Sequence, residues 1–327
     1  MTKQRTLYSL AAGIGMLCHS YIATAADTWD MPLAYSSDNY HSVLAAEFAK
    51  TVNEQAGDEI NIVTHPGGSL YKGNEIFGAV RRGLVPIGER LISALGNEDP
   101  IFEVDALPFV ATGFDDSWTL YQASKPEMEK VLDKKGVKLL YSVPWPPQGL
   151  YAKKPVSSLD DMKGSKFRAY NPMTVELARM MGAVPTKVET AEMSQAFATG
   201  VTESMIASGS TGYDRKIWEY VTYWYDVNAW LPKDMVFVNK RAWNRLSPET
   251  QKVIEAAAAD AEKAGWAQAR ELADWYKKEL ISNGMTVSEP TPELKEDFVQ
   301  LGNKVVKQWL VKAGDDGVNV INKYNQQ

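Results

Sequence analysis

The stretch Asp160-Asp161-Met162-Lys163-Gly164-Ser165-Lys166-Phe167-Arg168-Ala169-Tyr170-Asn171 is the segment around which the rest of the chain is organised. Its Lys163-Gly164 pair predicts a turn, because glycine adopts a positive φ at little cost. Residues 166–170 then predict a strand, in which side chains alternate between two faces. Phe167 would face a core, and Arg168 would point the other way.

Arg168 would therefore lie near the C-terminal end of a strand, just before a helix that Asn171-Pro172 opens. Ligands bind at such positions in open α/β sheets. A solvated arginine on an edge strand would produce the same local pattern. The stretch by itself leaves a ligand site and a surface arginine as alternatives.

The first 25 residues predict a cleaved secretory signal peptide. Lys3 and Arg5 form a basic start, residues 7–17 are apolar, and Ala23-Thr24-Ala25 is a small-x-small cleavage site, so the mature chain would begin at Ala26. The apolar run is too short for a membrane-spanning helix. We therefore expect a periplasmic protein; an uncleaved anchor is the alternative.

Composition narrows the class of protein further. The one cysteine, Cys18, lies in the signal segment, so the mature chain would have no disulfide and no thiol chemistry. The formal charge of −6 becomes −8 without Lys3 and Arg5, which argues against nucleic acid or an anionic membrane as a partner. About 300 mature residues exceed one ordinary core, so two lobes are expected.

The first half of the chain alternates strands and helices. Strands are expected at 30–35, 59–64, 85–91 and 138–143, and helices at 42–55, 72–82 and 115–133. This β-α-β-α-β order predicts a parallel sheet with right-handed crossovers.

The second half repeats this order after a Pro-rich segment, residues 144–149, that would cross between lobes. Strands are expected at 150–152, 166–170, 184–187 and 204–207, and a strand at 235–239 would cross back. Lobe I would then comprise residues 26–147 plus 234–275, and lobe II residues 148–233 plus 276–327.

Ser247-Pro248-Glu249 is a strong helix start, with an N-cap serine, proline at the first position and an acid near the positive end of the dipole. The helix would run to Ser282, and Gly265 is the one residue within it that disfavours a helix. Its ~35 residues would span ~50 Å, enough to run along both lobes. A last helix is expected at 291–312, followed by a polar, weakly determined tail.

Motifs for catalysis and for cofactors were not found in the sequence. Ser208-Gly209-Ser210-Thr211-Gly212 does not fit the nucleophile elbow of a hydrolase, and there is neither a phosphate loop nor a dinucleotide fingerprint. His41 and His65 have no metal-ligand spacing, and we interpret both as turn or surface residues. We expect no cofactor, no metal and no enzyme activity.

Several motifs, in order, resemble one family. They are Gly67-Gly68-Ser69-Leu70, Gly73-Asn74-Glu75, Ala79-Val80-Arg81-Arg82-Gly83, Leu107-Pro108-Phe109, Lys153-Lys154-Pro155-Val156, the stretch from Leu159 to Arg168, Gly182-Ala183-Val184-Pro185, Ala196-Phe197-Ala198-Thr199-Gly200-Val201 and Leu246-Ser247-Pro248-Glu249-Thr250-Gln251. The ordered set covers nearly the whole mature chain. It resembles the periplasmic solute-binding proteins of TRAP (tripartite ATP-independent periplasmic) transporters, the dicarboxylate-binding-protein-like group.

The resemblance implies an α/β, two-lobe periplasmic-binding-protein-like fold (type II), with hinge crossings and a long helix spanning both lobes. It implies a protein that captures a small organic acid and passes it to the membrane permease subunits of a TRAP transporter. The family's carboxylate-binding arginine falls on Arg168. A guanidinium pairs bidentately with a carboxylate, which lysine cannot do.

The chain departs from the family pattern at two places. The position of an asparagine that helps to hold the substrate is Ala207, and the segment 145–151 lacks the second arginine found in several relatives. Both departures remove polar contacts to a ligand. They favour one carboxylate on a fairly apolar body over sialic acid or a dicarboxylate.

Candidate residues of the ligand pocket lie at strand ends and crossings. Besides Arg168 they are Tyr35, Trp145, Tyr170, Ser208, Ser210, Tyr213 and Trp230. Arg90 is either a second cation for the ligand or an ion-pair partner of Glu89. Aromatic planes stack on aromatic rings, so we expect an aromatic or bulky apolar monocarboxylate, such as a benzoate or an aryl 2-oxo acid. Trp145 and Trp230 would alternatively pack the hinge.

Other functions fit the same residues. The chain could bind an aliphatic hydroxy or oxo acid or a dicarboxylate. It could serve as the ligand-sensing subunit of a receptor with the same fold. A secreted enzyme is the third alternative, and the missing motifs argue against it.

Overall fold

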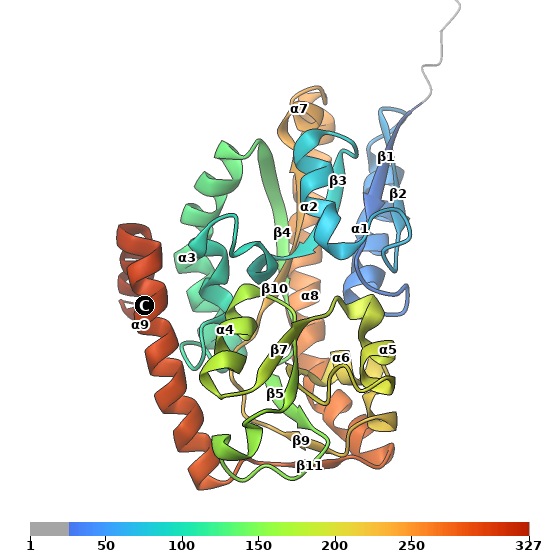
Figure 1. The fold of residues 1–327 in the computed structure, drawn as a ribbon. Helices are drawn as coiled ribbons and strands as arrows, with labels where there is room; N and C mark the ends of the chain where they lie inside the picture. Colours follow the sequence, from blue (N-terminus) through green and yellow to red (C-terminus); the bar gives the residue numbers. More distant parts are fainter. Residues whose placement is uncertain (1–25, 327) are drawn as a thin grey trace, which may run out of the picture.

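The structure, a computed structural model, describes residues 26–326, so the expected signal peptide lies outside the described residues. Two lobes are stacked end to end in Figure 1, and the strands form three sheets, of two, three and six strands. We call the part around strands β3, β10 and β4 lobe I, and the part around the six-stranded sheet lobe II. This two-lobe α/β architecture confirms the fold class expected from the sequence.

The strands of lobe I are β1 (Asp27–Pro32), β2 (Ile60–His65), β3 (Ile87–Leu91), β4 (Val137–Pro144) and β10 (Lys233–Asn239). β1 and β2 pair in parallel, as expected, and β3 contacts β1. β10 enters from lobe II and pairs antiparallel with both β3 and β4. β1 and β2 thus form a parallel pair, and β3, β10 and β4 form a separate antiparallel sheet, so the prediction of one parallel sheet in this part of the chain was wrong.

Helices flank the sheet of lobe I. They are α1 (Tyr40–Gln55), α2 (Gly73–Arg82), α3 (Phe114–Lys134) and α7 (Lys240–Trp243), with short 3₁₀ helices η1 (Ile92–Leu95) and η2 (Pro100–Ala106). The side chain of Asn39 caps α1 by accepting a hydrogen bond from the backbone N–H of His41 at 3.0 Å.

Lobe II has six strands in the order β11-β9-β5-β8-β6-β7. They are β5 (Gln148–Ala152), β6 (Lys166–Ala169), β7 (Val184–Lys187), β8 (Ser204–Ser208), β9 (Tyr223–Tyr225) and β11 (Thr286–Ser288). β6 runs parallel to β7 and β8, whereas β5 is antiparallel to β8 and β9. The remaining elements are α4 (Pro172–Met180), α5 (Met193–Ala198), α6 (Gly209–Asp214), η3 (Leu159–Met162), η4 (Thr190–Glu192) and η5 (Ile217–Glu219).

Two crossing segments run side by side from one lobe to the other. The first connects β4 to β5 and the second connects β9 to β10, as the Pro-rich segment and the 235–239 strand predicted. Trp145 N donates to Pro232 O at 2.8 Å, and Gln148 N donates to Trp230 O at 3.0 Å. These hydrogen bonds hold the two crossings together.

The long helix α8 (Pro248–Ser282) confirms the helix expected from its N-cap. The hydroxyl of Ser247 accepts a hydrogen bond from Thr250 N at 3.2 Å. α8 contacts α1 and β4 of lobe I and α6 and β11 of lobe II, and it runs through the length of the molecule in Figure 1.

The last helix, α9 (Pro292–Asn325), extends well past the expected end at residue 312. Its backbone kinks at Gly314, with φ 58°, and then continues through the segment expected to be a weakly determined tail. That segment packs because Val320 is fully buried and Tyr324 donates its hydroxyl to Val110 O at 2.9 Å. α9 contacts α3 and η2 of lobe I and α4 and η3 of lobe II, and the boundaries of the lobes near it stay a prediction.

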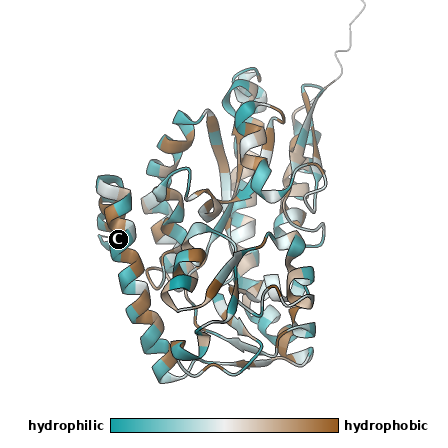
Figure 2. Ribbon diagram, viewed as in Figure 1, coloured by the Kyte–Doolittle hydropathy of each residue, from teal (hydrophilic) through white to brown (hydrophobic). Residues whose placement is uncertain are grey.

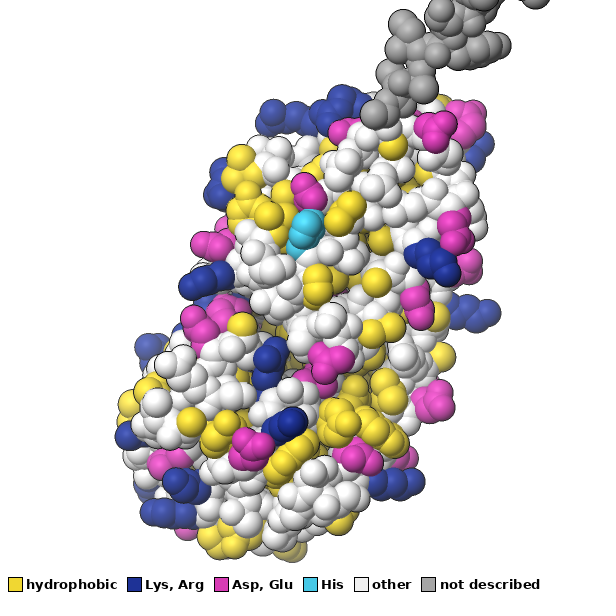
Figure 3. Space-filling model, turned by 90° about the vertical axis from the view of Figure 1, so that its right-hand side faces the viewer, with side chains coloured by type: hydrophobic (Ala, Val, Ile, Leu, Met, Phe, Trp, Pro, Cys, Tyr) yellow, Lys and Arg dark blue, Asp and Glu magenta, His cyan; other side chains and the backbone are white. Residues whose placement is uncertain are grey.

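Apolar residues concentrate on the strands and on the inner faces of the helices (Figure 2). On the face shown in Figure 3, acidic and basic side chains are interspersed. None of the helices within residues 26–326 combines the length and apolarity needed to cross a bilayer.

Candidate functional site

A small cavity lies where the two lobes meet the crossings. Its volume is about 30 Å³, room for two or three water molecules at ~10–15 Å³ each. Its lining residues are Tyr35, Leu91, Trp145, Gln148, Arg168, Tyr170, Thr190, Ala207, Thr211 and Pro232. Four of the residues expected from the sequence therefore come together here: Arg168, Tyr170, Trp145 and Tyr35.

Arg168 lies on β6 with its side chain in this cavity. Pairing of β6 between β7 and β8 buries the strand, and Arg168 is only 3% exposed. Its Nε donates to Val188 O at 3.1 Å, and its Nη2 donates to the hydroxyl of Thr190 at 3.5 Å. The guanidinium carbon also lies 5.1 Å from the centre of the Tyr170 ring, a cation–π distance.

Among the described residues, no carboxylate forms an ion pair with Arg168. Burial lowers the pKa of its guanidinium from its ordinary value to about 10, so it remains a cation at neutral pH. A buried, unneutralised charge is costly unless it is paired. The arrangement therefore provides a strong site for the carboxylate of a ligand.

Two aromatic rings form the wall of the cavity on the side of lobe I. Tyr35 and Trp145 meet edge to face with their centroids 4.8 Å apart. Both donate to Oδ1 of Asp234, Trp145 from Nε1 at 3.2 Å and Tyr35 from its hydroxyl at 3.4 Å. Asp234 thus orients both rings.

Tyr170 forms the lobe II wall and is itself oriented by hydrogen bonds. Its hydroxyl accepts from Nε1 of Trp230 at 3.0 Å and donates to Oε1 of Gln148 at 3.4 Å. Trp230 therefore lies behind Tyr170 and does not line the cavity.

Gln148, Thr190 and Thr211 add polar groups that the sequence alone did not point to. Gln148 begins β5 directly after Pro146-Pro147, and its position at the end of the crossing was the one available signal. Thr190 and Thr211 are brought in by the starts of η4 and α6. The cavity thus combines one cation with hydrogen-bonding groups at its edge.

Besides Trp230, three more of the expected residues lie outside the cavity. The hydroxyl of Ser208 caps α6 by accepting from Thr211 N at 3.2 Å. Ser210 is fully buried within α6. Tyr213 packs edge to face on Trp275 of α8, with centroids 4.9 Å apart.

Arg90 pairs with Glu189 and not with Glu89. Nη1 and Nη2 of Arg90 donate to the two carboxylate oxygens of Glu189 at 3.3 and 3.4 Å. The pair joins β3 of lobe I to the segment after β7 in lobe II. It borders a second cavity of about 180 Å³, which shares Tyr35 and Thr190 with the first.

A buried polar cluster lies behind the lobe I wall. His41, Glu89 and Asp234 place nitrogen and oxygen atoms within 4.8 Å of one another. His41 is 2% exposed in α1, so its interpretation as a turn or surface residue was wrong. Burial holds the pKa of His41 below its ordinary value and raises that of Glu89, and it raises the pKa of Asp234 to about 7. A neutral His41 and protonated carboxyl groups on Glu89 and Asp234 fit this dry environment. The same three side chains also lie close enough together to approach a metal ion.

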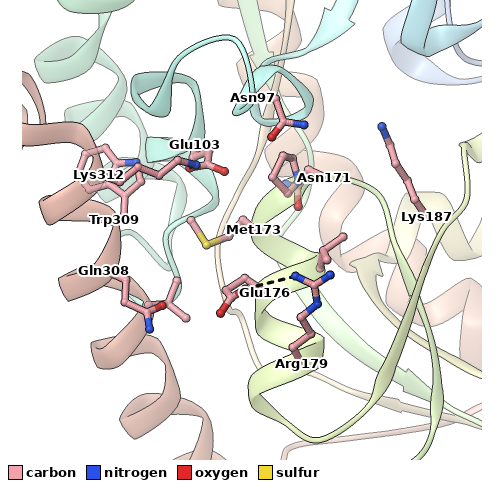
Figure 4. Close-up of a pocket in the computed structure, with 13 residues that line it drawn as sticks. Asn97, Glu103, Asn171, Met173, Glu176, Arg179, Lys187, Gln308, Trp309 and Lys312 are labelled. Carbon is pink, nitrogen blue, oxygen red and sulfur yellow. Dashed lines mark hydrogen bonds and ion pairs between the residues drawn. The ribbon is translucent and has the colours of Figure 1, made fainter.

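A separate groove of about 470 Å³ lies between α4, α9 and the loop that precedes η2 (Figure 4). In it Lys312 pairs with Glu103 at 2.9 Å, and Arg179 lies 3.9 Å from Glu176. It shares no lining residue with the cavity at Arg168. Four of its five charged side chains lie in these two pairs and the fifth is Lys187, whereas Arg168 is a buried guanidinium, so Arg168 remains the better candidate for binding an acid.

A family model described as "Bacterial extracellular solute-binding protein, family 7" (DctP) matches residues 33–312. The chain belongs to this family. The match covers most of the chain, and it confirms the resemblance to TRAP solute-binding proteins drawn from the motifs.

Solved structures of this family superpose closely. DctP6 of Bordetella pertussis, an extracytoplasmic solute receptor described as binding pyroglutamic acid, has 46% sequence identity and a TM-score of 0.90, over 92% of this chain and 100% of that one. A TRAP solute-binding protein from a marine metagenome, described as specific for pyroglutamate, has 43% identity and a TM-score of 0.91, over 93% and 100%.

More distant members of the family bind different solutes. The ectoine/5-hydroxyectoine-binding periplasmic protein UehA of Ruegeria pomeroyi is 25% identical over 321 residues, 95% of this chain and 93% of the relative. The family is thus one of solute-binding proteins, and the identity of the solute has to be argued from the site.

Proposed function

We propose that this chain is the extracytoplasmic binding protein of a TRAP transporter and that its ligand is a small cyclic monocarboxylate of the pyroglutamate type. The observation that carries the proposal is Arg168, which is 3% exposed and has no carboxylate partner among the described residues. One buried guanidinium accommodates one carboxylate.

Pyroglutamate suits the remaining polar groups. Its lactam ring presents one N–H donor and one C=O acceptor, and Gln148 and Thr190 lie beside Arg168 with groups able to meet them. Tyr35, Trp145 and Tyr170 cover the apolar edge of such a ring. The 42–46% identity to three structures of pyroglutamate-binding proteins supports the same ligand.

An aromatic monocarboxylate, the ligand expected from the sequence, is the second candidate. The three aromatic walls favour it, because they would stack on a planar ring. The cavity volume of about 30 Å³ does not separate the two ligands, because either one requires the lobes to open further. The identity to pyroglutamate-binding proteins favours the first candidate.

Transport follows from the family. We infer that the chain is exported with the help of residues 1–25 and delivers its ligand to the permease subunits of a TRAP transporter. Relatives described as periplasmic, such as UehA and the sialic acid-binding protein SiaP of Vibrio cholerae, support this location.

A ligand screen tests the proposal. Protein freed of co-purified solute by unfolding and refolding is examined by thermal shift and calorimetry with L-pyroglutamate, L-proline, benzoate, phenylpyruvate, succinate and sialic acid. Pyroglutamate at 100 times its Kd is expected to stabilise the protein by ~2.7 kcal/mol. L-Proline, which lacks the lactam carbonyl, is expected to bind more weakly. Stabilisation by benzoate or phenylpyruvate without pyroglutamate would establish the second candidate instead.

A further inference from the structure

Lobe I contains a second site suited to a carboxylate, separate from Arg168. It is formed by Arg90 on β3, which is 5% exposed, and by the N-terminal end of α2. The exposed N–H groups and the dipole at the start of a helix favour an anion. Gly73, the first residue of α2, allows close approach, because a Cβ there would lie 2.7 Å from Nη1 of Arg90.

Glu189 of lobe II occupies this site. Its two oxygens pair with the two terminal nitrogens of Arg90 at 3.3 and 3.4 Å, and Oε2 lies 3.1 Å from the Cβ position of Gly73. This is the bidentate geometry of a bound carboxylate ligand. The side chain of Glu189 is largely buried, with 23% exposed.

Three consecutive residues of lobe II together hold the two arginines, two of them contacting Arg168 and one contacting Arg90. The carbonyl of Val188 and the hydroxyl of Thr190 accept from Arg168, whereas the carboxylate of Glu189, between them, accepts from Arg90. Closing the lobes therefore presents Arg168 to the ligand and neutralises Arg90 in the same movement.

We propose that Glu189 is a specificity-determining residue that fills a second carboxylate site at Arg90, so that the closed protein accepts monocarboxylates and rejects dicarboxylates. This inference rests on the proposed function and deepens it. Because the cavities at Arg90 and Arg168 share Tyr35 and Thr190, a dicarboxylate that spans from one to the other would meet Glu189. Its second carboxylate would be repelled by a like charge and would find Arg90 already paired.

Removing the charge of Glu189 should expose the second site. In Glu189→Gln, Arg90 would become a buried cation without a partner, which strongly favours an incoming carboxylate. We expect the affinity for succinate or glutarate to rise at least tenfold over the wild type. We also expect pyroglutamate to bind several-fold more weakly, since the ion pair between the lobes is lost.

The matched control is Glu219→Gln. Glu219 is exposed in η5 of lobe II and lines neither of the two cavities. It should leave both affinities within twofold of the wild type. The double variant Arg90→Gln/Glu189→Gln should lose the gain for dicarboxylates, because the site itself is gone.

Calorimetry with L-pyroglutamate, succinate and glutarate on all four proteins measures these changes, with circular dichroism as the check of folding. Dicarboxylate affinity in Glu189→Gln no greater than in Glu219→Gln would overturn the inference, as would a gain that persists in the double variant. Failure of the wild type to bind pyroglutamate would instead contradict the proposed ligand, and the succinate and glutarate measurements would still decide the role of Glu189.

Discussion

Arg168 keeps its charge where water barely reaches it, and its own protein partners are a carbonyl, a hydroxyl and an aromatic ring. These neutral partners orient the guanidinium without neutralising it. The orientation comes from lobe II, through β6 and the segment after β7, so the group that we propose to bind the carboxylate is positioned by the protein itself.

Replacement of Arg168 should abolish binding without unfolding the protein. Arg168→Gln removes the cation, and we expect no detectable binding of pyroglutamate by calorimetry. Arg168→Lys should also weaken binding at least a hundredfold, because an ammonium cannot form the paired hydrogen bonds of the guanidinium. Arg179→Gln, at an exposed position of α4, is the control and should bind normally. Wild-type affinity in Arg168→Gln would show that the carboxylate binds elsewhere.

Tyr170→Phe tests the hydrogen bonds that orient the Tyr170 ring. The change leaves Nε1 of Trp230 without its acceptor and removes the donor to Gln148. We expect a loss of ~1–3 kcal/mol in unfolding free energy, the cost of an unsatisfied buried group, and several-fold weaker ligand binding. Urea unfolding and calorimetry measure both effects. Tyr223→Phe on β9, which is partly exposed, should change neither; equal losses in the two variants would contradict the role given to Tyr170.

At the scale of single residues, part of the candidate site was predicted from the sequence. Alternation along a short strand placed Arg168 opposite Phe167, and the family resemblance gave it a role. Gln148 and Thr190 could not be assigned because irregular segments position them, and the side-chain direction there has no period. The partner of Arg90 was missed for a related reason: Glu189 is 99 positions away and meets it only across the lobes.

The long helix α8 packs closely against lobe I at Gly265. A Cβ at Gly265 would lie 2.5 Å from Val143 of β4 and 2.7 Å from Leu44 of α1. Next to it, Trp266 donates from Nε1 to Ser142 O at 3.0 Å. Gly265 interrupts the sequence pattern of the helix at a position where a larger side chain would not fit.

Gly265→Ala should therefore destabilise the protein although alanine favours helices. Overpacking of a core typically costs ~1–3 kcal/mol, which exceeds the ~1 kcal/mol that alanine gains over glycine in a helix. Gly78→Ala in α2 is the matched control, because the nearest atoms there belong to the flexible end of Arg82. We expect Gly265→Ala to lower the melting temperature and Gly78→Ala to raise or maintain it. The same direction of change in both would contradict this account.

The elements were predicted best where local chemistry specifies an end. Ser247 with Pro248 located the start of α8, and Asn171 with Pro172 located that of α4. The second part of α9 was missed because Gly314 breaks the pattern, and only packing of Val320 and Tyr324 against other elements makes the helix resume. Tertiary contacts of that kind leave no local signal.

The whole molecule should respond to pH through its buried carboxyl groups. The folded-state pKa of Asp234 is raised from 3.8 to about 7, chiefly by burial and further by Asp105, while Trp145, Arg90 and Tyr35 lower it. The folded state therefore binds more protons than the unfolded state between these values. The stabilisation from Asp234 is complete below about pH 3.8 and is lost as the pH rises to about 7.

Comparison of the wild type with Asp234→Asn isolates this contribution. The unfolding free energy of the wild type relative to that of the variant should fall as the pH rises from 4.5 to 7.5, by at most ~1.4 kcal/mol per pH unit for one proton. Urea unfolding at four pH values measures it. A difference for Asp234→Asn that is flat, or that rises with pH, would contradict the buried, protonated carboxyl.

The unpaired charge of Arg168 also has a consequence for signalling. An empty protein that closes must seal a bare cation away from water, which costs free energy that a bound carboxylate would offset. The empty protein is therefore mostly open, and the closed shape becomes common only when an acid is bound. The closed shape thus carries information about occupancy, and a membrane partner that recognises this shape needs no contact with the ligand to distinguish a loaded protein from an empty one.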